Sequence, residues 1–223
     1  MEQFKGVKMK KIIACSDLHI PYTSRHFIAF ANYACEADIV VFNGDILDLV
    51  RCSVEEIKNS KTGRELLDAL KKVILKTKTV FIDGNHDPEL GKSLTELLGF
   101  EVESVPSYRL GRMSFIHGHQ LDPVCKYWNW KLLTKVAPFF FRPPSGWKKR
   151  NREKWKKKIG LIYTNAFTLL EENPWCTLLV IGHTHYPSLH KLETEQWVAD
   201  CGDMLDSISG LEIKNGKAKI ITL

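Results

Sequence analysis

The chain has 223 residues, of which 44% are hydrophobic and 26% charged, and a formal net charge of +6. This balance is typical of a globular protein and excludes a disordered or fibrous one. No apolar run approaches the roughly 20 residues that a membrane-spanning helix needs, and the basic N-terminus lacks the apolar stretch of a signal peptide. We therefore expect a single cytoplasmic domain over residues 1–223, with its scattered cysteines reduced.

The first half of the chain alternates short apolar runs with helical patterns. Buried strands, recognised by uninterrupted apolar and β-branched residues, are predicted at 11–15, 39–42 and 79–82. Helices, recognised by apolar residues at helical spacing, are predicted at 24–36, 62–77 and 93–98. This alternation favours an α/β fold with parallel strands.

The second half continues with strands and ends in a predicted meander. Single strands are expected at 112–116 and 178–181, and the meander at 188–193, 196–201, 210–214 and 217–223. The pair Asn215-Gly216 predicts a two-residue hairpin turn between the last two strands. From these elements we expect a four-layer α-β-β-α sandwich of two mixed β-sheets.

Five of the predicted strands end in short clusters of His, Asp and Asn. The clusters are Asp17-x-His19, Gly44-Asp45, Asn85-His86-Asp87, His117-Gly118-His119 and Gly182-His183-x-His185. Six of the eight histidines of the chain lie in these clusters. Because the carboxyl ends of neighbouring strands meet at one edge of a sheet, we expect the clusters to converge there.

The pooled clusters offer a set of ligands for divalent metal ions. The candidate ligands are Asp17, His19, Asp45, Asn85, His117, His183 and His185. This mixture of carboxylate, imidazole and amide groups favours Mn, Fe or Zn over Ca or Cu(I). The set is too large for one tetrahedral ion and suits two ions that share a bridging carboxylate. Such a pair generates hydroxide near neutral pH and neutralises charge on a phosphoryl oxygen.

In their order along the chain, the five clusters resemble those of the calcineurin-like metallophosphoesterases. The resemblance implies the metallophosphatase fold and two divalent ions, for which we expect Mn ahead of Fe or Zn. It implies a first metal site formed by Asp17, His19, Asp45 and His185. It implies a second site formed by Asp45, Asn85, His117 and His183, with Asp45 bridging.

The same resemblance assigns roles in the reaction to two further residues. It implies that His86 protonates the leaving oxygen or stabilises the transition state, and that Asp87 orients the ring of His86. Two interpretations stay open for Asp48, which either caps the following turn or contacts the site, and for Asp203, which either lines the cleft or is structural. We prefer His117 to His119 as the ligand of its cluster because it stands at the strand end.

A basic and aromatic insert at 123–160 interrupts the alternation. It holds twelve Lys and Arg residues against one acidic residue, and Pro143-Pro144 divides it into two predicted helices. We expect a helical lid beside the metal site, with an apolar slot and a basic mouth. The candidate substrate-binding residues are Trp128, Trp130, Phe140, Lys148 and Arg150. The structural alternative is a pair of solvated helices that pack on the body of the domain.

Within the family, a helical insert at this place resembles that of the UDP-2,3-diacylglucosamine pyrophosphatases of lipid A synthesis. The cluster His117-Gly118-His119 stands where that group would have His-Gly-Asp. The resemblance implies an anionic phosphorylated substrate such as a nucleotide-linked lipid, with peripheral contact at the inner face of a membrane. Two alternatives remain: a phosphodiesterase or nuclease acting on nucleotides or single-stranded nucleic acid, and a non-catalytic binding scaffold.

Overall fold

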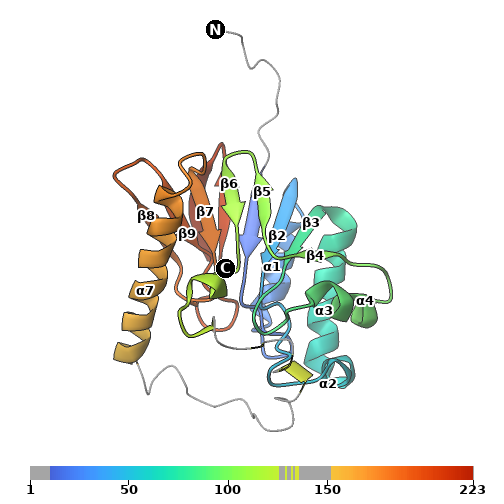
Figure 1. Ribbon diagram of the computed structural model, residues 1–223. Helices are drawn as coiled ribbons and strands as arrows, with labels where there is room; N and C mark the ends of the chain where they lie inside the picture. The colour runs from blue at the N-terminus through green and yellow to red at the C-terminus, as the bar shows by residue number, and fades with distance from the viewer. Residues whose placement is uncertain (1–10, 126–128, 130–131, 133, 136–151, 223) are drawn as a thin grey trace.

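A computed structural model describes residues 11–125, 129, 132, 134–135 and 152–222. Two β-sheets lie between helices, with α7 on one outer side and α1, α3 and α4 on the other (Figure 1). In the described part of the chain, no helix is both long and apolar enough to cross a membrane.

The first sheet has six strands in the order β11-β10-β1-β2-β3-β4. Their bounds are β1 Ile12–Cys15, β2 Ile39–Asn43, β3 Lys78–Ile82, β4 Ser104–Val105, β10 Ser209–Lys214 and β11 Lys217–Thr222. Strands β1 to β4 run parallel to one another, whereas β10 pairs antiparallel with both β1 and β11. The sheet is therefore mixed, and the ends of β1, β2 and β3 point to the same edge.

The second sheet has five strands in the order β5-β6-β7-β9-β8. Their bounds are β5 Tyr108–Leu110, β6 Met113–Phe115, β7 Leu178–Ile181, β8 Ser188–Lys191 and β9 Trp197–Asp200. Strands β6, β7 and β9 are parallel, and β5 and β8 pair antiparallel at the two sides. The expected architecture of two mixed sheets is confirmed.

The helices in the described residues include two that begin at a serine whose side chain accepts a backbone N–H. Their bounds are α1 His26–Ala34, α2 Val54–Asn59, α3 Lys61–Lys76, α4 Leu90–Leu98 and α7 Arg152–Glu171, with a short 3₁₀ helix η1 at His119–Leu121. Ser53 and Glu56 form a reciprocal capping box at the start of α2, and Ser60 caps α3. Gly99 ends α4 in the left-handed conformation.

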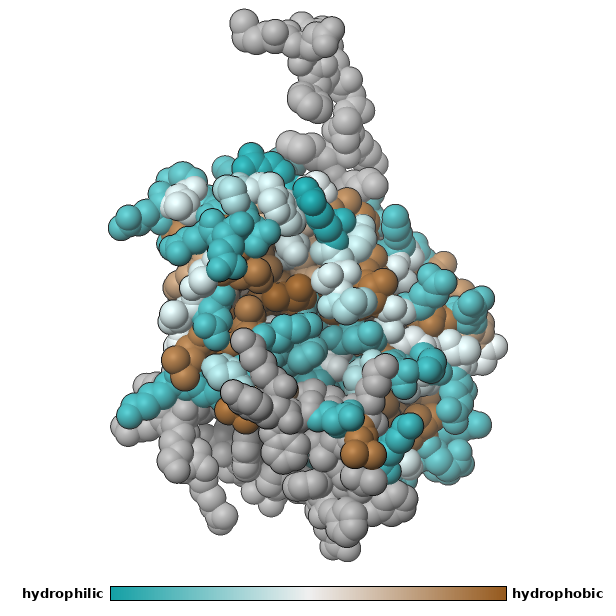
Figure 2. Space-filling view, in the orientation of Figure 1, coloured by the Kyte–Doolittle hydropathy of each residue, from teal (hydrophilic) through white to brown (hydrophobic). Residues whose placement is uncertain are grey.

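Three apolar layers hold the sandwich together. The layer between the sheets includes Val41, Phe115 and Val180, whereas Phe27 and Leu70 belong to the layer between the first sheet and its helices. A third cluster joins α7 to the second sheet. On the face shown in Figure 2, hydrophilic side chains line most of the outline, and the exposed apolar ones form separate patches. The three layers produce the predicted four-layer order.

Most predicted elements are present, but several elements and one pairing differ. The sequence analysis predicted no helix over residues 161–171, the C-terminal half of α7. Strands β4 and β5 and helix α2 were not predicted, because none is long enough to show a period. The C-terminal strands do not form one meander: β8 and β9 belong to the second sheet, whereas β10 and β11 belong to the first. The chain therefore crosses between the sheets at residues 201–208.

The predicted insert at 123–160 lies largely outside the described residues. Helix α7 begins at Arg152, inside the predicted insert, and continues to Glu171 as the outer layer of the second sheet. The described end of the insert is therefore part of a helix of the domain body, and both the lid and its structural alternative stay predictions.

The fold depends on close backbone approaches at the edge where the clusters meet. A Cβ atom on Gly182 would lie 2.2 Å from Oγ of Ser16 and 2.8 Å from Oδ2 of Asp17. Glycine is therefore required after β7 because the loop following β1 packs directly against it. In helix α7, by contrast, a Cβ on Gly160 would meet no atom within 4 Å.

We expect Gly182→Ala to lower the free energy of unfolding by about 1–3 kcal/mol, because the added methyl group must displace the loop that carries Asp17. Gly160→Ala is the matched control and should raise the free energy of unfolding by about 0.5–1 kcal/mol, since alanine is the better residue inside a helix. Urea unfolding followed by circular dichroism measures both. Equal stability of Gly182→Ala and the wild type would contradict this packing.

Candidate metal centre

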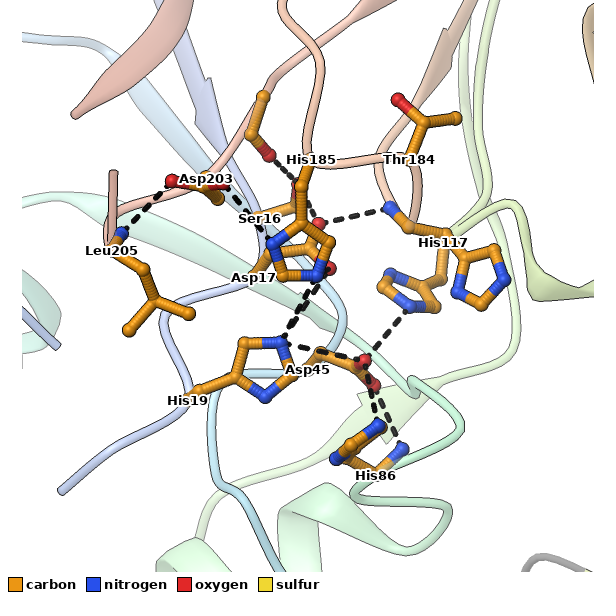
Figure 3. A network of polar contacts seen from close by, with 12 residues as sticks. Ser16, Asp17, His19, Asp45, His86, His117, Thr184, His185, Asp203 and Leu205 are labelled. Carbon is orange, nitrogen blue, oxygen red and sulfur yellow. Dashed lines mark hydrogen bonds and ion pairs between the residues drawn. The ribbon is translucent and has the colours of Figure 1, made fainter. Parts of the chain in front are cut away.

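The loops that follow β1 and β7 bring the first group of polar side chains together (Figure 3). Nε2 of His185 lies 3.1 Å from Oδ1 of Asp17 and 3.4 Å from Nε2 of His19. The three side chains offer ligand atoms within 4.8 Å of one another, and Asp17 and His19 are buried. They form one candidate ion site.

The loops after β2, β6 and β7 form a second group around Asp45. Nε2 of His117 lies 3.3 Å from Oδ2 of Asp45, and His183 joins them within 4.8 Å. The same Oδ2 lies 3.9 Å from Nε2 of His19, in the first group. Asp45 therefore stands between the two groups, where a bridging carboxylate would be.

Five of the seven predicted ligands have a left-handed backbone. The φ angles are 53° at Asp17, 53° at His19, 52° at Asp45, 67° at His183 and 58° at His185. Side chains other than glycine rarely adopt this region, and each such residue costs on the order of 1–3 kcal/mol. The concentration of these angles in one place indicates that the surrounding fold turns the side chains inward against their own preference.

Two histidines are oriented by a hydrogen bond on the ring nitrogen that faces away from the centre. Nδ1 of His117 donates to the backbone oxygen of Asn43 at 2.8 Å, and Nδ1 of His185 donates to Oδ2 of Asp203 at 3.1 Å. In both rings Nε2 is thereby left facing the carboxylates of the centre. Asp203, whose role the sequence left open, contacts the site through His185. Such outer partners fix the tautomer and ring direction of metal-binding histidines.

Several buried atoms in the centre lack a hydrogen-bond partner. Within the described residues these include Oδ1 of Asp17, Oδ1 of Asn85 and Nε2 of His117. A buried polar atom without a partner costs about 1–3 kcal/mol, more if it is charged. A divalent cation would satisfy these oxygen and nitrogen atoms, and a mixed O/N donor set suits Mn, Fe or Zn. The residues present therefore fit the ions that the sequence implies.

The pKa shifts in the centre also indicate that its carboxylates need positive charge nearby. Burial opposes ionisation, yet the imidazoles of His185 and His117 hold the pKa of Asp17 and Asp45 below the ordinary value. Burial also opposes protonation of the rings, but Asp45 and Asp17 raise the pKa of His117 and His185 to about 9. Protons on these rings would compensate the carboxylates where an ion does not, so protons and ions compete for the centre.

His86 lies beside the centre, and its ring is oriented by a residue other than the predicted one. Nδ1 of His86 donates to Oδ1 of Asp48 at 2.8 Å, and Nε2 lies 3.9 Å from Oδ2 of Asp45. The prediction that Asp87 orients this ring is wrong. The carboxylate of Asp87 instead accepts backbone N–H groups from residues 45, 46, 47 and 84. Asp87 joins the loops after β2 and β3, and Asp48 contacts the site.

His119 remains outside the candidate ion groups of the described residues. Its ring centroid lies 5.5 Å from that of His117. Burial, and then the proximity of His117, lower the pKa of His119 to about 3, so this ring is neutral. The structure thus brings His117, and not His119, to the centre.

The sequence analysis missed one residue of the site, and five of its predicted residues lie outside the described part of the chain. Asp122, which the sequence analysis did not single out, accepts a hydrogen bond from Nε2 of His183 at 2.9 Å. No motif pointed to it, because it follows the His117 cluster in an irregular loop. The predicted substrate-binding residues lie outside the described part of the chain: Trp128, Trp130, Phe140, Lys148 and Arg150.

Comparisons with known proteins show what this chain is similar to. UDP-2,3-diacylglucosamine hydrolase of Shewanella frigidimarina is 23% identical over 96% of this chain and 98% of its own length. The protein of the same name from Coxiella burnetii is 22% identical over 82% of this chain and 84% of its own. The crystal structure of TT1561 from Thermus thermophilus shares the fold, with a TM-score of 0.50 and 10% identity over 96% of this chain and 99% of that one.

The sequence also matches a family model, described as calcineurin-like phosphoesterase, over residues 10–187. The matched stretch includes all five clusters, from Asp17 to His185. The match covers most of the chain, and the relatives are named as hydrolases. The chain therefore belongs to the calcineurin-like phosphoesterase family and is a phosphoester hydrolase.

Proposed function

We propose that the chain uses two divalent ions to hydrolyse the pyrophosphate bond of a nucleotide-linked lipid such as UDP-2,3-diacylglucosamine. The observation that carries this substrate class is the similarity, along nearly the whole chain, to a protein named for that hydrolysis. The buried O/N centre supports the use of metal ions.

The proposed ligands follow the two groups of the centre. Asp17, His19 and His185 would hold one ion, and Asn85, His117 and His183 the other, with Asp45 shared. When bound, such ions activate a water molecule near neutral pH and neutralise charge on phosphoryl oxygens. We propose Mn ahead of Fe or Zn. The chain itself contributes by burying these side chains, fixing their orientation and bringing their ligand atoms close together.

His86 is the proposed acid on the open side of the centre. Asp48 holds Nδ1, so that Nε2 is the atom turned towards Asp45 and the reacting group. From there Nε2 can give a proton to the leaving oxygen or donate a hydrogen bond to the phosphoryl group as charge develops. The ring of His86 is about 15% exposed, which leaves it accessible to a substrate.

A cavity of about 620 Å³ is lined by both apolar and charged side chains. Its lining includes Leu49 and Pro88, which directly follow Asp48 and Asp87 in the sequence, together with Cys52, Val54, Glu56, Glu89 and Lys135. The volume falls within the range of small-ligand sites. We propose that it takes the organic portion of the substrate. Contact of the insert with a membrane surface stays a prediction.

The metal proposal is tested by titrating metal-stripped protein with Mn²⁺ in a calorimeter. We expect two ions per chain and a higher melting temperature, because ligands that bind only the folded state stabilise it. Asp45→Asn should weaken both ions by more than the roughly 10–100-fold that loss of an outer partner causes. Glu193→Gln, at an exposed position, is the control. Full affinity for both ions in Asp45→Asn would exclude the bridging role.

The role of His86 is tested by single-turnover and steady-state kinetics. His86→Ala should lower kcat by about 10²–10⁴-fold, the range of general acid catalysis, while two Mn²⁺ ions remain bound. Asp48→Asn should lower kcat less, because the amide can still accept the hydrogen bond from Nδ1. The exposed His26 provides the control His26→Ala. Unchanged kcat in His86→Ala would remove this residue from the reaction.

The substrate class is tested by comparing UDP-2,3-diacylglucosamine, bis-p-nitrophenyl phosphate and a short single-stranded oligonucleotide with Mn²⁺-loaded protein. We expect kcat/KM to be highest for the lipid nucleotide, because the cavity and the relatives both favour it. Val54→Asp should lower kcat/KM for that substrate, since a carboxylate would face its apolar part, and leave bis-p-nitrophenyl phosphate unaffected. Preference for the oligonucleotide would instead support a nuclease.

A further inference from the structure

Asp122 is a fully buried carboxylate behind the second ion group. It lies directly after η1 and is 0% exposed. Its Oδ2 is 2.9 Å from Nε2 of His183, and its Oδ1 accepts the backbone N–H of Val124 at 2.9 Å. A buried carboxylate is stable only where donors or cations surround it. Asp122 therefore needs a positive partner, and it directly contacts His183, a proposed metal ligand.

A lysine from helix α7 supplies the positive charge. Nζ of Lys158 lies 2.6 Å from Oδ2 of Asp122, and the Lys158 side chain is 29% exposed. The thiol of Cys125 adds a weaker hydrogen bond to the same oxygen at 3.3 Å. Lys158, Asp122 and His183 thus form a continuous polar chain from the outer helix of the second sheet to the metal centre.

This chain determines which nitrogen of His183 is available. Because Nε2–H is bound to Asp122, the unprotonated atom of the neutral ring is Nδ1. The backbone of His183 is held as well, since its amide donates to Oδ2 of Asp17 at 2.9 Å and its φ angle is 67°. His183 is therefore held both at its backbone amide and at Nε2 of its ring. Nδ1 is left for the group formed with Asp45 and His117.

The same carboxylate belongs to another possible ion group. Asp122, Cys125 and His183 offer ligand atoms within 4.8 Å of one another, a set that could itself hold a metal ion. A cation there would use Nε2 of His183 and the carboxylate that orients it. The ammonium group of Lys158, at 2.6 Å, occupies the cation position beside this carboxylate.

We propose that Asp122 and Lys158 are positioning residues that together hold His183 for the second ion and couple helix α7 to the metal centre. The proposal rests on the proposed function, since it concerns a ligand of that centre. Two other contacts support the coupling to α7. Nδ2 of Asn165 donates to the backbone oxygen of Leu121 at 2.8 Å, next to Asp122. The hydroxyl of Tyr163 shares Asp200 with Thr184, between the two last histidines.

Coupling of this kind is reciprocal by thermodynamic necessity. If the position of α7 sets the affinity for the second ion, then binding of that ion must stabilise α7 to the same extent. Among the described contacts, no residue of the first ion group touches Asp122, and that group meets His183 only through its backbone amide and through the shared Asp45. Its affinity should therefore depend on Lys158 less than that of the second ion. The two ions thus provide an internal comparison.

The first experiment is calorimetric titration of metal-stripped protein with Mn²⁺. Asp122→Ala should weaken the second ion by about 10–100-fold, the usual effect of losing an outer partner, and weaken the first ion less. Asp122→Asn should restore most of this affinity, because its amide oxygen can accept from Nε2–H. Lys158→Met should weaken the second ion as well. The neighbouring exposed residue gives the matched control Lys157→Met, which should change neither ion.

The second experiment reads the positioning itself in the ion-free protein. ¹⁵N spectra of the histidine side chains should show His183 as the Nε2–H tautomer in the wild type and a mixture of tautomers in Asp122→Ala. Hydrogen exchange should show that Mn²⁺ protects the amides of α7 in the wild type and in Lys157→Met, and does so less in Lys158→Met. A purely structural role would lower the melting temperature without changing either readout.

Three results would overturn the proposal. The first is unchanged affinity for the second ion in Lys158→Met, a variant that should fold even where Asp122→Ala does not. The second is equal weakening of both ions in Lys158→Met. The third is a Co²⁺–thiolate absorption band in the wild type that Cys125→Ser removes, because Asp122 would then be a ligand. Two Mn²⁺ ions bound as expected without hydrolysis of any phosphoester would refute the proposed function and leave the positioning role supported.

Discussion

The structure depends on placing carboxylates in a dry interior where the ends of two sheets meet. Asp17 and Asp45 are 0% and 1% exposed, at a place where neighbouring strands supply apolar walls. Burying such charges is costly unless a counter-charge and hydrogen bonds accompany them. The surrounding imidazoles meet part of this need, because Asp45 and Asp17 raise the pKa of His117 and His185 and so favour protonation of these rings where an ion is absent. A pair of divalent cations would supply the rest of the counter-charge. The same buried carboxylates thus determine both how the loops fold and which ions they can bind.

Meeting that constraint requires loops that approach one another more closely than ordinary side chains allow. A Cβ on Gly84 would lie 2.1 Å from Oδ1 of Asp45, and a Cβ on Gly44 would lie 2.5 Å from the ring of His117. Asp87 then joins these loops by accepting N–H groups from both. The left-handed backbone at the ligand positions is sustained by this surrounding framework, because isolated loops would relax to commoner angles.

The sequence predicted the features that repeat and missed those that depend on tertiary contact. Apolar strands followed by His, Asp and Asn clusters predicted both the strands of the sheets and the residues at the edge where the strands end. The role given to Asp87 was wrong because proximity in sequence to His86 says nothing about which carboxylate the ring faces, and Asp48 comes from another loop. Asp122 carried no signal, since its importance arises only when η1 and α7 pack together. The assignment of β9 and β10 to different sheets likewise depends on a crossover that no local pattern specifies.

Helix α7 differs from the other outer helices in how it meets the centre. The helices on the first sheet bury apolar side chains against that sheet. Helix α7 does the same on the second sheet with Ile162 and Ala166, but its Lys158 also reaches a carboxylate in direct contact with a proposed ligand. Lys158 therefore connects the packing of α7 on the second sheet to the carboxylate that orients His183.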